Sequence, residues 1–424
     1  MISRRLLLGA GAATIAVAAA RPSRVSGGHS PYFASLNGLL RKEGIDRPVL
    51  MIDLDRLDRN IDRLTASAAA GTGRTLRIAV KSVPAPGLVD YIGRRSGSGA
   101  GMVFHRPFLE EMAVRQPGWN YLLGKPMPVA ALAGVYDRLQ GVAAFDPSRQ
   151  LRWLIDTETR LAQYLAFADQ RALLLRVSLE IDVGLHRGGF ATPAALAGVL
   201  ATIAAHPDRL VLGGLMGYDG HILGLPEILR GREADAVKSR YAAFADLLRR
   251  DFPALTRPPG GLVLNGSGSP SFRYHETGSP LTDISVGSAL MKPSHYDLPA
   301  LTDFEASSFI ATPVLKRGAD QGVPTMEWLG GPMRVWDPNS ADILFAYGGN
   351  WLADPVSPAG VSRSGIYESS NQAGYHLSQD VILATDDFLF LRPTQSEAVL
   401  LQFGDLLGVR GDRIETRWPV LQSS

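Results

Sequence analysis

Lys81 is one of six lysines in the sequence, and it stands where a primary amine could do chemistry. It directly follows Ile78-Ala79-Val80, an apolar run that is typical of a buried strand. A lysine amine that is desolvated at a strand end can form a Schiff base with an aldehyde. The same position also suits a lysine whose ammonium group only extends into solvent. From the residues alone, both interpretations stay open.

The segment 180–190 combines acidic residues with an arginine in a glycine-rich turn. Arg187 can present its planar guanidinium group to a phenolate or a carboxylate. The alternative is a structural ion pair with Glu180 or Asp182. Arg187 is therefore a candidate binding residue at the end of a second predicted strand.

Two further groups of polar residues follow apolar runs. Tyr218 and His221 could place a phenol ring and an imidazole at the same edge, although either side chain alone is more often part of the packing. After Leu262-Val263-Leu264, the residues 265–269 read Asn-Gly-Ser-Gly-Ser. Small residues between glycines let backbone N–H groups converge on a phosphate, which in barrel enzymes commonly lies after the seventh and eighth strands.

The elements that must position these residues alternate regularly from Arg47 onward: an apolar run, a turn, then a stretch with helical apolar spacing. This rhythm predicts an α/β fold, a parallel (β/α)₈ TIM barrel over 47–291, with an open doubly wound sheet as the alternative. Residues 292–424 are rich in Gly, Pro, Asp and short alternating strands, and are predicted to form a second, β-rich domain. The runs expected as barrel strands are 49–52, 76–80, 102–104, 121–123, 151–155, 173–177, 210–212 and 262–264.

The first twenty residues are not expected to belong to the fold. Arg4 and Arg5 precede an apolar run from Leu6 to Ala20, which is shorter than the ~20 residues that span a bilayer. Small residues at 18–20 form a cleavage-site pattern, so residues 1–20 are predicted to be a twin-arginine-type signal peptide and the protein to be periplasmic. An uncleaved N-terminal anchor is the alternative. Residues 21–46 would then be an N-terminal extension.

The composition of the chain excludes several classes of binding partner and of chemistry. The 43 basic and 41 acidic residues give a formal charge of +2, so no strong field favours nucleic acid or an acidic membrane surface. Cleavage after Ala20 would remove two arginines and leave a mature charge near zero. No stable membrane insertion of the mature protein is expected. The absence of cysteine excludes disulfides, thiolate metal sites and a cysteine nucleophile.

Taken together, these segments resemble the fold type III pyridoxal-phosphate enzymes, in particular the D-threonine aldolase and D-serine dehydratase branch of the alanine racemase-like superfamily. The resemblance extends over nearly the whole chain after the leader and implies a barrel of the alanine racemase N-terminal type. The motifs that carry it are, in chain order, 51–55, 59–61, Lys81, 180–187, 218–221, 265–269, 403–405, 409–412 and 418–420.

The resemblance implies a role for each matching residue. Lys81 matches the lysine that holds pyridoxal 5'-phosphate as a Schiff base, and Arg187 matches the arginine that reaches the cofactor's phenolic oxygen. Tyr218 and His221 match residues near the cofactor ring, with His221 a candidate acid–base group. The phosphate would be held by small residues, namely Ser267, Gly268, Ser269, Gly287 and Ser288. The family's habit also implies a homodimer.

The sequence departs from this branch where the family carries a metal pair in the β-domain. Gln395 and Glu397 occupy those positions, and glutamine is a poor ligand for zinc, although a carboxylate could help hold a harder ion. A divalent metal is therefore doubtful, and no metal-binding residue is predicted.

The function that the resemblance implies is that of a pyridoxal-phosphate-dependent lyase acting on a small D-amino acid with a β-hydroxyl group, similar to D-threonine aldolase. Two alternatives remain. Racemisation needs only the cofactor and two opposed acid–base groups, with Lys81 on one face and a tyrosine or His221 on the other. The third interpretation is a protein that binds the cofactor or an amino acid without catalysis.

Overall fold

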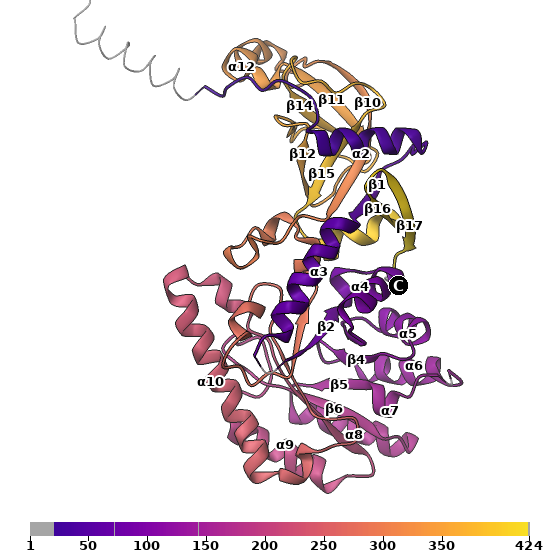
Figure 1. Ribbon diagram of the computed structural model, residues 1–424, viewed down its shortest axis with the longest axis vertical. Helices are drawn as coiled ribbons and strands as arrows, with labels where there is room; N and C mark the ends of the chain where they lie inside the picture. The colour runs from indigo at the N-terminus through magenta and orange to yellow at the C-terminus, as the bar shows by residue number, and fades with distance from the viewer. Residues whose placement is uncertain (1–20, 72, 143, 423–424) are drawn as a thin grey trace, which may run out of the picture. The chain divides into compact units, whose positions relative to one another are not determined.

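The computed structural model describes residues 21–71, 73–142 and 144–422, so the predicted export signal at 1–20 lies outside the described part and stays a prediction. Within the described residues, no helix is both long and apolar enough to cross a membrane. The chain divides into two compact units (Figure 1). The larger contains the described residues of 52–308, together with 395–408 and 415–422, and the smaller contains the remaining described residues. The domain limits expected at 47, 291 and 292 stay predictions.

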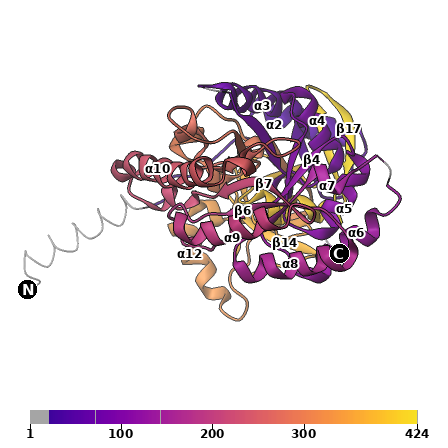
Figure 2. The same ribbon diagram turned by 90° about the horizontal axis from the view of Figure 1, so that it is seen from below.

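The larger unit is built on a closed barrel of eight parallel strands (Figure 2). This confirms the predicted barrel in place of an open sheet. Each strand pairs in parallel with its neighbours, and β2 closes the ring against β9. The strands are β2 (Thr75–Ala79), β3 (Ala100–Val103), β4 (Asn120–Leu123), β5 (Leu151–Ile155), β6 (Leu175–Glu180), β7 (Leu210–Gly217), β8 (Val263–Gly266) and β9 (Asp283–Val286).

Helices follow these strands and cover the outside of the barrel, because each carries one apolar face. In α9, Thr192 caps the first turn by accepting the N–H of Ala195, and Pro193 occupies the first helical position, as the sequence predicts. The helices of this unit are α3 (Leu54–Ala69), α4 (Pro86–Ser96), α5 (Arg106–Arg115), α6 (Val129–Leu139), α7 (Pro147–Gln150), α8 (Glu158–Arg171), α9 (Pro193–Ala205), α10 (Glu227–Asp251), α11 (Ser288–Met291) and α13 (Ser396–Val399).

For the barrel, the sequence assigns one strand wrongly and misses another. The run Val49–Asp53 forms β1, which belongs to the other sheet rather than to the barrel. The eighth barrel strand is instead β9, whose sequence Asp-Ile-Ser-Val has too few apolar residues to stand out. Its polar positions face the barrel interior, where Asp283 and Ser285 have hydrogen-bond partners. Because the interior positions of β9 are polar, this strand lacks the apolar run by which the other barrel strands were predicted.

The smaller unit contains an antiparallel sheet, which is the predicted β-rich part. Its strands pair in the order β13-β14-β11-β10, and β15 pairs with both β10 and β12. The predicted run 388–391 lies in β15, whereas 381–384 forms no strand. The elements wholly within this unit are α2 (Pro31–Lys42), α12 (Gly330–Trp336), β11 (Asp342–Tyr347), β12 (Ala353–Ser357), β13 (Ser362–Arg363), β14 (Gln372–Leu377) and β15 (Phe388–Pro393). Four strands divide between the units, namely β1, β10 (Ser308–Ala319), β16 (Asp405–Arg410) and β17 (Arg413–Pro419).

A buried ion pair links the first and last barrel strands. Arg77 of β2 is 1% exposed and contacts both carboxylate oxygens of Asp283 on β9, at 3.0 and 2.8 Å. The same guanidinium group donates to the carbonyl of Gly101 and to the side chain of Asn120. Since a buried charge is costly unless it is paired, this pair helps close the barrel below the polar rim.

Replacing Asp283 by alanine would leave the Arg77 cation buried without its carboxylate. We expect Asp283→Ala to lower the free energy of unfolding by about 3–5 kcal/mol. The matched control is Asp62→Ala, which removes the partner of Arg95 in an exposed pair and should cost less than about 1 kcal/mol. Urea unfolding followed by circular dichroism measures both. Equal effects of the two substitutions would contradict a stabilising role for the buried pair.

Candidate active site

A cavity with an empty volume of about 600 Å³ opens at the C-terminal ends of the barrel strands, where barrel enzymes keep their chemistry. Its lining comes from strand ends and the loops that follow them, and one further residue comes from α13. The lining residues are Ala79, Lys81, Ser82, Met102, Phe104, Gly124, Arg187, Met216, Tyr218, Asn265, Ser267, Gly268, Ser269, Pro270, Ser285, Gly287, Ser288, Tyr296 and Glu397.

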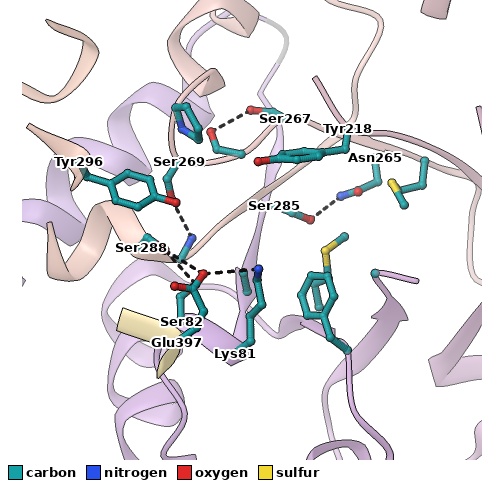
Figure 3. A pocket seen from close by; sticks show the side chains of 18 of the residues that line it. Lys81, Ser82, Tyr218, Asn265, Ser267, Ser269, Ser285, Ser288, Tyr296 and Glu397 are labelled. Carbon is teal, nitrogen blue, oxygen red and sulfur yellow. Dashed lines mark hydrogen bonds and ion pairs between the residues drawn. The ribbon is translucent and has the colours of Figure 1, made fainter. Parts of the chain in front are cut away.

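Lys81 lies in the short turn Val80–Ser82 that directly follows β2, and its side chain enters the cavity (Figure 3). Its Nζ lies 3.4 Å from Oε1 of Glu397 and 4.9 Å from the centroid of the Phe104 ring. The amine therefore has a carboxylate on one side and an aromatic face on another. The side chain is half-buried, so Lys81 is held at the cavity rather than released into bulk solvent.

Glu397 is surrounded by serine hydroxyls. Ser82 donates to its Oε1 over 3.1 Å, and Ser288 donates to Ser82 over 3.0 Å (Figure 3). Ser396 lies 3.3 Å from the other carboxylate oxygen. Burial alone would raise the pKa of Glu397, but the Lys81 charge and the hydrogen bonds it accepts outweigh burial and lower that pKa. Glu397 is therefore a carboxylate that stays ionised beside the Lys81 amine.

Arg187 and Tyr218 form a second wall of the cavity. The Arg187 guanidinium carbon lies 5.2 Å from the centroid of the Tyr218 ring, a cation–π distance, and Nη2 lies 3.6 Å from Glu180. Burial raises the pKa of Tyr218 to about 12, so its hydroxyl keeps its proton at neutral pH. Burial also raises the pKa of Glu180, opposed by Arg187. Arg187 thus both lines the cavity and contacts Glu180, so its two interpretations from the sequence are compatible.

The serine–glycine loop after β8 faces the start of α11. The Ser269 hydroxyl accepts the N–H groups of Ala289, at 2.9 Å, and of Gly287, at 3.4 Å. Ser267 has a φ of +70°, which turns the chain sharply after the strand. Ser267, Gly268 and Ser269 and the start of α11 therefore bring small side chains and backbone N–H groups to one end of the cavity.

His221 is the one predicted site residue that the cavity lining does not include. The turn Gly220–Gly224 directs its Nε2 to Glu233 of α10, at 3.1 Å. The side chain lies against Gly184, where an added Cβ would come within 3.0 Å of Nε2. His221 therefore contacts a helix on the barrel's outside instead of the cavity, in contrast to the expected acid–base role.

Several residues that line the cavity were not predicted as site residues from the sequence, although Asn265 belongs to the 265–269 motif and Glu397 was considered at a family metal position. Phe104 and Asn265 stand at strand ends, and that position was the signal by which they could have been found. Tyr296 lies in a short turn after α11, and Glu397 follows β15, far from the barrel strands in the chain. Nothing in the sequence near these two residues indicates that they return to the barrel rim.

The described fold and site define a barrel enzyme whose rim carries an amine–carboxylate pair and a serine–glycine loop. A family model described as "Alanine racemase, N-terminal domain" matches residues 52–294, more than half of the chain. The chain belongs to this family, in the fold type III branch of the pyridoxal-phosphate enzymes.

The relatives are distant in sequence and similar in fold. The chain is 23% identical to the "3-hydroxy-D-aspartate aldolase" of Paracoccus denitrificans (strain Pd 1222), over 89% of this chain and 92% of that protein. The D-threonine aldolase from Filomicrobium marinum superposes with a TM-score of 0.70 at 18% identity, covering 89% of this chain and 96% of that one. The D-threo-3-hydroxyaspartate dehydratase from Delftia sp. HT23 gives 0.67 at 18%, covering 89% and 98%. These two likenesses establish the fold.

The lining residues fit a phosphate-bearing aldehyde such as pyridoxal 5'-phosphate. A Cβ added to Gly287 would come within 2.8 Å of the Ala79 carbonyl oxygen, so this point of the cavity lining has room only for glycine. The Oδ1 atom of Asn265 is buried and accepts no hydrogen bond from any described residue, although its Nδ2 donates to Ser285. The cavity therefore offers a free acceptor, a primary amine and a small-residue cup.

The described part of the chain contains no group of three or more histidine, aspartate or glutamate side chains arranged to hold a metal ion. Gln395 lines a groove next to the cavity, together with Glu397 and His295. Glu397 itself is engaged by Lys81 and Ser82. None of these contacts tests whether a divalent metal binds, so that part of the sequence analysis stays a prediction.

Proposed function

We propose that this protein is a pyridoxal-phosphate-dependent lyase that cleaves a D-amino acid with a β-hydroxyl group, with Lys81 holding the cofactor. The observation that carries the proposal is the placement of Lys81 Nζ at the cavity, 3.4 Å from an ionised glutamate. Support comes also from the relatives, which are named as aldolases and a dehydratase of D-hydroxyamino acids.

Each part of the cavity has a separate task in this proposal. Lys81 binds the cofactor's aldehyde carbon, and the cup formed by 267–269 with Gly287 and Ser288 receives its phosphate. Arg187 directs its guanidinium group to the phenolic oxygen, a contact that suits a planar fork of donors. When bound, the cofactor withdraws electrons from the Cα atom of an attached amino acid.

Glu397 would act as the base that accepts the proton of the substrate's β-hydroxyl group. Cleavage of the Cα–Cβ bond of a β-hydroxy amino acid needs a base for the β-hydroxyl proton. Of the described residues that line the cavity, Glu397 is the one carboxylate, and its lowered pKa keeps it ionised and ready to accept. The adjacent Lys81 amine can then exchange that proton with it. Ser82 and Ser288 hold the carboxylate in place through their hydroxyls.

One observation keeps racemisation as a second candidate. Tyr218 lines the same cavity as Lys81 and carries a phenol whose pKa burial raises to about 12. A protonated phenol can return a proton to Cα, while the lysine amine removes one from the opposite face. Racemisation requires no base for a β-hydroxyl group, so the two candidates differ in their need for Glu397.

Incubation of the enzyme with pyridoxal 5'-phosphate and D-threonine tests the lyase. We expect glycine and acetaldehyde in equal amounts from the native protein and none from Lys81→Ala, measured by chromatography of both products. Lys238→Ala is the matched control, since this lysine pairs with Asp235 on α10 and lies outside the cavity lining. Exchange of the Cα proton for deuterium without cleavage would instead favour the racemase. Bound cofactor with neither reaction would favour the binding protein.

Glu397→Gln keeps the size of the side chain and removes its charge. We expect cleavage by this variant to slow about 10²–10⁴-fold, the range of general base catalysis, with cofactor still bound. Hydrogen bonds from Ser82 and from a backbone N–H also lower the pKa of Glu397 and stay in place when Lys81 holds the cofactor, so ionisation of Glu397 should not limit kcat/KM between about pH 5 and about pH 8. The rate should fall only as pH drops through that lowered pKa.

Glu305→Gln is the control, since that carboxylate pairs with Arg59 away from the cavity. Full activity of Glu397→Gln would show that another group takes the β-hydroxyl proton.

A further inference from the structure

A buried polar network lies directly behind the cavity wall. Asp219 accepts a hydrogen bond from Ser271 through Oδ1, at 2.5 Å, and contacts Nε2 of His275 through Oδ2, at 2.7 Å. The other ring nitrogen of His275 lies 2.8 Å from the Ser279 hydroxyl. Asp219 and Ser271 are 0% exposed and His275 is 3% exposed. Such groups are stable inside a protein only when every partner is in place.

The order of contacts rules out a hydrolytic triad. In a nucleophilic triad the histidine stands between the serine and the carboxylate. Here the carboxylate of Asp219 stands between Ser271 and His275, so the histidine cannot take the serine proton. Ser271 is also closed to any substrate, because it has no exposed surface. The network therefore has a task other than nucleophilic catalysis.

The network joins two segments that line the cavity. Asp219 is the chain neighbour of Tyr218, and Ser271 accepts the N–H of Gly268 at 3.2 Å. The N–H groups of Ser271 and Phe272 in turn donate to the Gly268 carbonyl, each at 3.0 Å. The N–H group and the carbonyl group of Gly268 are thus both hydrogen-bonded to the segment 271–272, and Asp219 holds that segment through Ser271.

The Tyr218 ring is confined by the same segments. A Cβ added to Gly268 would come within 2.7 Å of Cε2 of this ring, and one added to Gly220 within 2.6 Å of its Cζ. The ring therefore packs against two glycine backbones. Gly220 directly follows Asp219, and Gly268 lies three residues before Ser271. A shift of the loop after β8 would move the ring and the serine–glycine cup together.

We propose that Asp219, Ser271 and His275 form a clamp that holds the 267–269 loop, against which the Tyr218 ring packs, in position for the cofactor's phosphate. These are positioning residues, since none of the three lines the cavity. Asp219 joins the end of β7 to the loop after β8, and His275 supplies a hydrogen-bond partner for the buried carboxylate. The clamp rests on the proposed function, because it acts on the same cofactor.

Pyridoxal 5'-phosphate and pyridoxal give a matched pair of probes, because they share the aldehyde and differ in the phosphate. Absorbance titration of the native protein, Asp219→Asn, His275→Ala and His275→Gln with both compounds measures the two dissociation constants. We expect the first two variants to bind the phosphate compound about tenfold more weakly, the equivalent of one hydrogen bond, and pyridoxal unchanged. His275→Gln should recover most of the affinity, because its amide can still donate to Asp219.

Tyr164→Phe is the control for loss of a buried hydrogen bond in the same barrel, since its hydroxyl contacts the backbone of Met127 at 2.8 Å. It should change neither constant. Equal weakening of both compounds in Asp219→Asn, or no change in either, would overturn the clamp while the proposed function stands. If the native protein binds neither compound, the proposed function fails, and the clamp fails with it. Should His275→Ala not fold, Asp219→Asn and His275→Gln still decide the outcome.

Discussion

The ion pair between Lys81 and Glu397 links the turn after the first barrel strand to a segment that returns from the end of the chain. Ser82 and Glu397 are separated by 315 positions in sequence, and their side chains lie 3.1 Å apart. A partly exposed ion pair contributes only about 0–1 kcal/mol to stability, so its main consequence is the placement of charge. A basic amine and an ionised carboxylate are fixed at the same end of the cavity, ready to exchange a proton.

The barrel makes this placement possible because its closure brings eight strand ends to one rim. Its interior is not uniformly apolar. Arg77 and Asp283 pair inside the barrel, and Asn265 extends the polar contacts from Asp283 to the cavity. After β7 and β8, the buried side chains of Asp219 and His275 form a second contact, at 2.7 Å. The cavity therefore borders two buried polar networks, which limits how far its walls can shift.

Much of the site could be predicted, since apolar runs mark strands and the polar residue after a run lies at the rim. Lys81, Arg187, Tyr218, the 267–269 loop, Gly287 and Ser288 all line the cavity. His221 is absent from that lining, because the turn Gly220–Gly224 brings its ring to Glu233, and its expected role stays a prediction. The strand β9 was not predicted, because its interior positions are polar and give no apolar run. The contact between Glu397 and Lys81 could not be predicted, because only the tertiary structure brings α13 back to the barrel.

The most direct test of the central claim is to trap the cofactor on the protein. Borohydride reduction of the native protein with pyridoxal 5'-phosphate, followed by protease digestion and mass spectrometry, identifies the modified lysine. The proposal predicts a single stoichiometric adduct on Lys81 and none on the other five lysines. An adduct on another lysine, or no adduct at saturating cofactor, would contradict the assignment of Lys81 and with it the proposed chemistry of the site.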